Sequence, residues 1–152
     1  MQRHGWTLLF HDCLMDQLLK LHGAAQRAER SDPIGFASNA NAKLFHALSR
    51  LVLEVIPLDP SRDEYRQGNT LGRRFRHWRR AKISRRFRLF FRYDARTRVV
   101  VYAWANDQSA LCSSGSRNDP YSIFARMLTR GNPPDDRASL KTALKQGWPN
   151  GK

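Results

Sequence analysis

The sequence has little cysteine, few acidic residues and no long apolar stretch. Neither of its two cysteines, Cys13 and Cys112, lies in a CxxC or Cys/His pattern, so we expect no zinc site and no structural disulfide. No run of about 18 apolar residues occurs, and residues 1–6 are too polar for a signal peptide. We therefore expect a cytoplasmic protein with no membrane partner.

Motifs for bound cofactors are also missing. The chain has no glycine-rich phosphate loop, no serine nucleophile elbow and no carboxylate cluster with metal-ligand spacing. We therefore expect no cofactor and no metal ion, and an activity that depends on ordinary side chains.

Positive charge is what the chain has in excess. It carries 27 Lys and Arg residues against 13 Asp and Glu residues, a formal net charge of +14. Residues 65–93 contain 11 of the basic residues and no acidic residue, interleaved with aromatic residues such as Trp78 and Phe90. The aromatic residues indicate a folded segment. Such a block favours a polyanionic partner, either nucleic acid or an acidic protein.

Helical periodicity marks two N-terminal segments. Leucine and alanine recur on one face over residues 12–30, with Asp12 as the expected N-cap. Leucine and valine recur over residues 39–56, with Ser38 or Asn39 as the expected N-cap. Both segments are expected to be amphipathic helices that pack on a shared core.

The periodicity then changes to two-residue alternation, which predicts strands at residues 78–84, 86–93 and 98–104. Short connections favour an antiparallel meander. A last helix is expected between a cap at Asp119 and a stop at Gly131.

This order of elements predicts an α+β domain. Two N-terminal helices would pack on one face of a small antiparallel sheet, and a C-terminal helix would follow. We expect one domain over residues 1–134 and a polar tail over residues 135–152. The sheet face opposite the two helices is expected to be free to bind a ligand.

Alternation along the first two strands predicts which residues share that exposed face. A hairpin would bring together Arg80, Lys82 and Arg88, with Trp78 or Phe90 beside them. Guanidinium groups bind phosphate oxygens through two hydrogen bonds, and an aromatic face can stack on an unpaired base. The alternative is that these cations only protect a sheet edge.

Several further residues are candidates for a role in binding or catalysis. Neighbouring positive charges favour the neutral form of a lysine, which would let Lys82 act as a base. His77 is the one histidine in the basic block and is the alternative base. By the same alternation, Arg86 and Arg92 are expected on the exposed face with Arg88, where they could bind nucleic acid. Tyr121, at the start of the last helix, can contact a phosphate or a base.

Several segments, in one order along the chain, match a known family. They are Tyr65-Arg66-Gln67-Gly68, Leu71-Gly72, Trp78-Arg79-Arg80-Ala81-Lys82, Phe87-Arg88-Leu89-Phe90-Phe91-Arg92-Tyr93, Trp104-Ala105-Asn106-Asp107 and Asp119-Pro120-Tyr121. With these segments the chain resembles the YhaV toxins of the RelE-like ribonuclease group.

The resemblance implies a RelE/ParE-like fold and the toxin of a type II toxin–antitoxin system. Such a toxin is a metal-independent endoribonuclease, an mRNA interferase that inhibits translation, often on ribosome-bound mRNA. Its chemistry is attack of the ribose 2′-hydroxyl on the adjacent phosphate, which leaves a 2′,3′-cyclic phosphate. The implied partners are RNA and a PrlF-type antitoxin, with operator DNA bound only through the antitoxin complex.

By position, the functional residues that the resemblance implies are Arg80, Lys82, Arg88 and Tyr121. The chain departs from the family pattern at Cys112, where a basic residue is common, and Arg117 is the nearby candidate to replace that charge. Two alternatives stay open: a non-catalytic module that binds RNA or the ribosome, and a gyrase-inhibiting toxin on the same fold.

Overall fold

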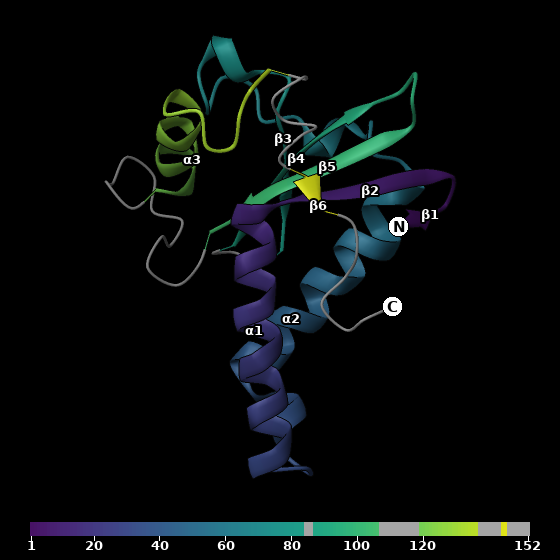
Figure 1. The fold of residues 1–152 in the computed structure, drawn as a ribbon, viewed down its shortest axis with the longest axis vertical. Helices are drawn as coiled ribbons and strands as arrows, with labels where there is room; N and C mark the ends of the chain where they lie inside the picture. The colour runs from purple at the N-terminus through teal and green to yellow at the C-terminus, as the bar shows by residue number, and fades with distance from the viewer. Residues whose placement is uncertain (84–86, 107–118, 137–143, 146–152) are drawn as a thin grey trace.

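A computed structural model describes residues 1–83, 87–106, 119–136 and 144–145 (Figure 1). The helices are α1 (Asp12–Ser31), α2 (Ala40–Arg50) and α3 (Pro120–Thr129). The strands are β1 (Gln2–Arg3), β2 (Trp6–His11), β3 (Arg79–Lys82), β4 (Arg88–Asp94), β5 (Val99–Ala105) and β6 (Leu144–Lys145). In Figure 1, α1 and α2 lie side by side and extend well beyond the sheet.

Helix α1 begins where the sequence predicts, but its N-cap is a different residue. The His11 side chain accepts a hydrogen bond from the Cys13 backbone N–H, and Asp12 lies in the first turn of the helix. The expectation that Asp12 caps the helix is therefore wrong. An imidazole with an unprotonated Nδ1 can act as this acceptor. Burial lowers the pKa of His11, and the nearby Asp12 carboxylate opposes that shift.

Helix α2 has the predicted cap and a shorter regular part. The Asn39 side chain accepts hydrogen bonds from the backbone N–H groups of Asn41 and Ala42. The expected helix over residues 39–56 changes after Arg50 into a π-helical turn, Leu51–Val55. A short 3₁₀ turn, Ile56–Leu58, then contains the proline that ends the run.

The sheet is mixed, which corrects the purely antiparallel arrangement expected from the sequence. Strands β3, β4 and β5 form the predicted antiparallel meander. The chain's first long strand, β2, then pairs with β5 in parallel, so the order is β1-β2-β5-β4-β3. Strand β6, which belongs to the segment expected as a tail, pairs with β2. The boundary at residue 134 stays a prediction.

One core lies between the sheet and the first two helices. It combines Leu14 and Leu18 of α1 and Leu48 of α2 with side chains from one face of the sheet. Strand β2 supplies every second residue to this core, as expected for a strand with one buried face. The sheet residues of this core are Trp6, Leu8, Phe10, Ala81, Leu89, Phe91, Val100, Tyr102 and Ala105.

A second core covers the opposite face, so the expectation of a free sheet face is wrong. Helix α3 lies on that face, and the Phe124 ring stacks on Phe90 with 4.5 Å between ring centroids. The Phe124 ring also stacks on Trp104 and meets Trp78 edge to face. Only the part of this face that α3 leaves uncovered can contact a ligand.

Candidate functional site

The hairpin of β3 and β4 brings the predicted cations together. Lys82 is the cross-strand partner of Arg88, and Arg80 is the partner of Phe90. Since alternate residues of a strand share a face, Arg80, Lys82 and Arg88 lie on the α3 side of the sheet. The predicted grouping of these three residues is confirmed. We call Arg80, Lys82 and Arg88 the cationic face.

The three side chains of the cationic face differ in exposure. Lys82 is exposed, Arg80 is half-buried and Arg88 is buried. The Arg80 guanidinium donates long hydrogen bonds to the carbonyl oxygens of Glu64 (3.4 Å) and Arg66 (3.5 Å). Its Nε is buried and has no hydrogen-bond partner within the described residues. Each Nη group carries two N–H donors and uses one of them, so Arg80 retains donor capacity in its Nη groups, on the same face as the exposed Lys82 side chain.

Arg88 is held by its neighbours at the start of β4. Its backbone N–H donates to the Asn106 side-chain oxygen, and its carbonyl accepts from the Asn106 backbone N–H. Its Nη1 donates to the Phe87 carbonyl at 3.0 Å. The expectation that Arg88 is exposed is wrong, because its exposed fraction is 9%.

Trp78 and Phe90 are part of the core. Both are fully buried, and both contact the Phe124 ring. The expectation that they lie on an exposed face is wrong, because alternation fixes the side of the sheet and α3 covers that side. A buried ring offers no face to an RNA base, so base stacking does not fit these two residues.

Helix α3 places Tyr121 next to the cationic face. The Asp119 side chain accepts a hydrogen bond from the Tyr121 backbone N–H, as predicted for the N-cap. The Tyr121 ring is half-buried and meets Phe90 edge to face at 5.6 Å. Because Arg80 pairs with Phe90 across the hairpin, this contact brings Tyr121 to the same side of the sheet as Arg80.

His77 belongs to a different cluster, centred on Asp135. Its Nε2 lies 2.6 Å from Asp135 Oδ1, and the Trp78 indole N–H donates to the same oxygen at 2.8 Å. Arg92 donates to the Asp135 carbonyl at 2.8 Å and lies over the Trp78 ring. Arg92 is half-buried, so the expectation of a free cation at this position is wrong. The cluster ties the chain after α3 to the sheet.

The two candidate bases belong to different clusters. Lys82 is the last residue of β3, and His77 lies in the turn two residues before Arg79, the first residue of the strand. His77 contacts Asp135, whereas the cross-strand partner of Lys82 is Arg88.

Gln67, Asn106 and Asp135 organise the site, and sequence reasoning did not assign them a role. The buried Gln67 amide donates to the carbonyls of Phe75 and Trp78, and its oxygen accepts from the Leu71 backbone N–H. Polar residues among buried ones were the available signal, because a buried amide needs several partners. The partners of Asn106 and Asp135 lie 18 or more residues away in sequence and were not predictable from local patterns.

Three residues of the predicted site lie outside the described residues. These are Arg86, Arg117 and Cys112. Their proposed contributions to RNA binding stay predictions.

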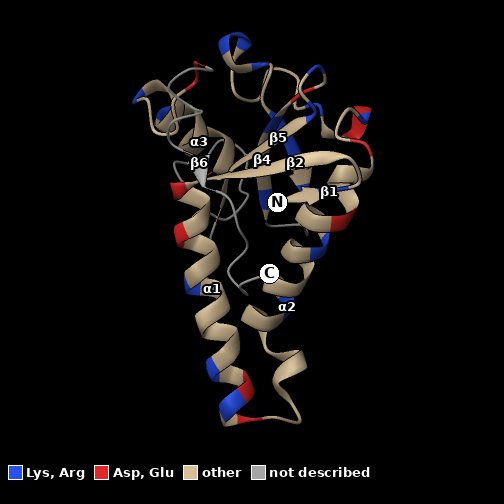
Figure 2. Ribbon diagram, turned by 45° about the vertical axis from the view of Figure 1, so that its right-hand side comes forward, with Lys and Arg blue, Asp and Glu red and all other residues tan. Residues whose placement is uncertain are grey.

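Charge is unevenly distributed over the described structure. In Figure 2, α1 carries both acidic and basic segments, whereas the strands and the loops beside them carry most of the basic ones. Within the described residues, no group of three or more His, Cys, Asp or Glu side chains is arranged to hold a metal ion. No helix in that same part of the chain is long and apolar enough to cross a bilayer.

Residues 8–145 match a family described as a toxin with endonuclease activity, of a toxin–antitoxin system, with the name Toxin_YhaV. Toxin YhaV of Escherichia coli O6:H1 is 34% identical over 139 residues, which are 90% of each chain. Ribonuclease toxin YhaV of Escherichia coli (strain K12) is 33% identical over the same length and coverage. No solved structure matches the chain.

Proposed function

Because the chain belongs to the YhaV family of toxins, we propose that it is a metal-independent endoribonuclease that cleaves RNA at the cationic face. The observation that carries this proposal is the register of the β3–β4 hairpin. In this register Lys82 is the cross-strand partner of Arg88, and Arg80 lies two residues before Lys82 on the same face of β3. The positive charges of Arg80 and Arg88, fixed in this way, suit a phosphate diester, because they are in place before the substrate binds.

In this proposal, Lys82 in its neutral form takes the proton of the ribose 2′-hydroxyl. The 2′-oxygen forms a bond to the adjacent phosphorus, and the bond from phosphorus to the 5′-oxygen breaks. The products are a 2′,3′-cyclic phosphate and a 5′-hydroxyl that has gained a proton. We assign the base to Lys82 instead of His77, because Lys82 is paired across the hairpin with Arg88, whereas His77 lies before β3 and is engaged by Asp135.

The other residues of the face stabilise charge and orient the RNA. Arg80 binds the scissile phosphate with its remaining guanidinium donors and stabilises the dianionic transition state. Because the Arg88 side chain is buried, it contributes a fixed positive charge to the site without itself binding the phosphate. Tyr121 lies at the N-terminal end of α3, where its hydroxyl orients the RNA chain. An arginine is a poor base, so neither Arg80 nor Arg88 replaces Lys82.

The proposed partners are mRNA, on or off the ribosome, and a PrlF-type antitoxin. We propose that the antitoxin covers the cationic face with acidic side chains, and that operator DNA is bound only through the antitoxin complex. Support comes from the excess of 27 basic over 13 acidic residues in the chain. The proposed fold is RelE-like, and the proposed compartment is the cytoplasm, where mRNA is translated.

Purified protein incubated with RNA in EDTA, with and without ribosomes, tests the proposal. We expect specific cleavage in EDTA and no inhibition of gyrase in a supercoiling assay. Binding of RNA without cleavage in both settings would favour a non-catalytic module. Gyrase inhibition without RNA cleavage would favour a gyrase-inhibiting toxin. Recovery of activity only after Mg²⁺ or Mn²⁺ is added would contradict metal independence.

A further inference from the structure

Three exposed arginines project from a turn outside the cationic face. Arg73, Arg74 and Arg76 belong to or flank the 3₁₀ turn Arg73–Phe75, and all three are exposed. Within the described residues, no carboxylate lies within 4.0 Å of any of them. Four other arginines pair with carboxylates of the described residues, in Arg3–Glu54, Arg62–Glu64, Arg66–Asp63 and Arg92–Asp135. We call these three residues the arginine turn.

Buried residues fix the backbone of the arginine turn. Phe75, inside the turn, is buried in the core under α3, and so is Leu71. The buried Gln67 amide donates to the Phe75 carbonyl at 3.1 Å and to the Trp78 carbonyl at 3.3 Å. Gly72 precedes the turn with φ +88°, a conformation that a side chain would strain. The turn is therefore a fixed platform, and ligand binding does not have to order its backbone.

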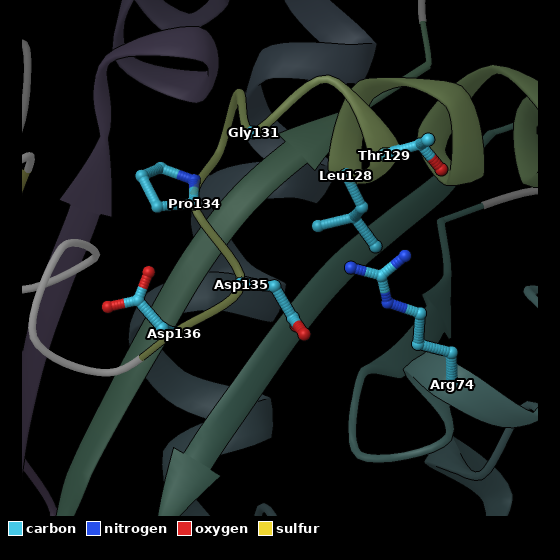
Figure 3. Close-up of a pocket in the computed structure, with 7 residues that line it drawn as sticks. All are labelled: Arg74, Leu128, Thr129, Gly131, Pro134, Asp135 and Asp136. Carbon is cyan, nitrogen blue, oxygen red and sulfur yellow. The ribbon is translucent and has the colours of Figure 1, made fainter.

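A pocket adjoins the arginine turn at the C-terminal end of α3. Arg74 and Thr129 line it, and its volume is about 500 Å³. Figure 3 shows the Arg74 guanidinium extending toward Leu128. Asp135 and Asp136 form another part of the lining. Since carboxylates repel phosphate, a nucleic-acid backbone is expected to follow the arginine side and to avoid the Asp side.

The arginine turn and the cationic face lie near opposite ends of α3, because Thr129 lines a pocket with Arg74 and Tyr121 contacts Phe90. Tyr121 is near the start of α3 and Thr129 is at its end, a separation of eight residues. At 1.5 Å per residue this is about 12 Å. An RNA strand that occupies both places would present one phosphate for cleavage and neighbouring phosphates to the turn.

We infer that the arginine turn is a second RNA-binding site, which binds the phosphates of nucleotides flanking the cleavage position. The ligand class is single-stranded RNA, recognised through its backbone charge. The inference rests on the proposed ribonuclease function for the place of the turn relative to cleavage. The turn adds binding free energy for long substrates and takes no part in the chemical step.

The test compares two triple variants that remove the same charge. R73Q/R74Q/R76Q removes the arginine turn. The matched control R27Q/R30Q/R50Q removes three exposed arginines of the α1–α2 hairpin that have no carboxylate partner within 4.0 Å in the described part of the chain. Fluorescence anisotropy measures binding of each protein to a labelled oligoribonucleotide of about 20 nucleotides, longer than single-strand footprints of 4–16. Circular dichroism verifies that each variant is folded.

Loss of three phosphate contacts to a single strand is expected to lower the slope of log affinity against log salt by about 2. At about 0.15 M salt this corresponds to binding roughly 10- to 50-fold weaker. The control is expected to bind like wild type. The variant R73K/R74K/R76K keeps the charge and is expected to retain most of the affinity. Cleavage of a dinucleoside monophosphate, whose only phosphate is the scissile one, is expected to be unchanged in all variants.

Different failures have different meanings. If wild type cleaves RNA and the turn variant binds long RNA as tightly as wild type, the inference is wrong and the proposed function stands. If wild type binds RNA without cleaving it, the proposed function is wrong, and the binding comparison still decides the role of the turn. If the turn variant loses only antitoxin binding, the turn is a protein interface and the inference is overturned.

Discussion

Replacement of Arg80 by alanine is expected to lower the rate of RNA cleavage strongly while changing the stability of the fold little. The Arg80 guanidinium donates two hydrogen bonds, to the carbonyls of Glu64 and Arg66, at the long distances of 3.4 and 3.5 Å. Bonds of this length fall at the weak end of the range, so together they contribute about 1 kcal/mol to the free energy of unfolding. The buried Nε has no partner within the described residues and costs a comparable amount.

These two contributions nearly cancel, so Arg80→Ala is expected to change the free energy of unfolding by less than about 1 kcal/mol. For a chain of this size, that is a shift in Tm of about 2–4 °C or less. Loss of a phosphate-binding group that acts in the transition state lowers the rate by about 10²-fold or more. The effect on activity should therefore greatly exceed the effect on stability.

The assay measures single-turnover RNA cleavage and thermal unfolding on the same protein samples. Arg50→Ala, on the exposed end of α2, serves as the charge-matched control. Arg80→Lys is expected to recover part of the rate, because it keeps the charge and loses the two-pronged geometry. Arg80→Ala that cleaves at the wild-type rate would refute the assignment. A rate loss that follows the loss of folded protein would refute the argument from weak hydrogen bonds.

Three further predictions follow from the contacts described above. Tyr121→Phe keeps the ring contact with Phe90 and removes the hydroxyl, so Tm should be unchanged while loss of one hydrogen bond to the RNA lowers the cleavage rate by up to about tenfold; an unchanged rate would exclude a role for the hydroxyl. Phe124→Ala should lower the free energy of unfolding in urea by about 3–5 kcal/mol, because it leaves a cavity under α3; a loss below about 1 kcal/mol would contradict the packing of α3 on the sheet. Burial lowers the pKa of His11 in the folded protein below its ordinary value of 6.5, so the unfolded chain binds the proton first, and stability should fall as pH decreases through about 6.5 and level off below the folded pKa. His11→Asn, which keeps a capping acceptor, should flatten that dependence, and an unchanged pH profile in this variant would contradict it.

Local patterns predicted the part of the fold that carries the site. Two-residue alternation placed Arg80, Lys82 and Arg88 on one face, and the observed pairing of Lys82 with Arg88 agrees. Alternation succeeds here because β3 and β4 are close in sequence, and the register of a hairpin follows from its short connection. The cap at Asn39 was predictable for the same reason, since its partners are two and three residues away.

Long-range pairing was not predictable from local patterns. Strand β2 joins β5 in parallel, and this contact connects residues near position 8 with residues near position 100. The position of α3 has the same character. Phe90 and Trp78 looked like exposed aromatics on a binding face, although their partner Phe124 lies in a separate helix. Apolar residues on both faces of β4 and β5 were the signal that both faces are covered.

The Asp135 cluster could not be inferred from the sequence either. Asp135 lies in a segment expected to be a polar tail, yet it contacts His77, Trp78 and Arg92. A single carboxylate that follows two prolines has no periodic pattern that would reveal its partners. Its contacts also explain why the basic block carries less free charge than its composition indicates.

The most direct test of the central claim uses an RNA substrate with one 2′-deoxynucleotide at the position of cleavage. The proposed chemistry needs the 2′-oxygen as its nucleophile. In EDTA, the all-ribose substrate should yield a 2′,3′-cyclic phosphate and a 5′-hydroxyl, and the deoxy-substituted substrate should stay intact at that position. Cleavage of the deoxy-substituted position, or products with a 3′-hydroxyl and a 5′-phosphate, would contradict the account.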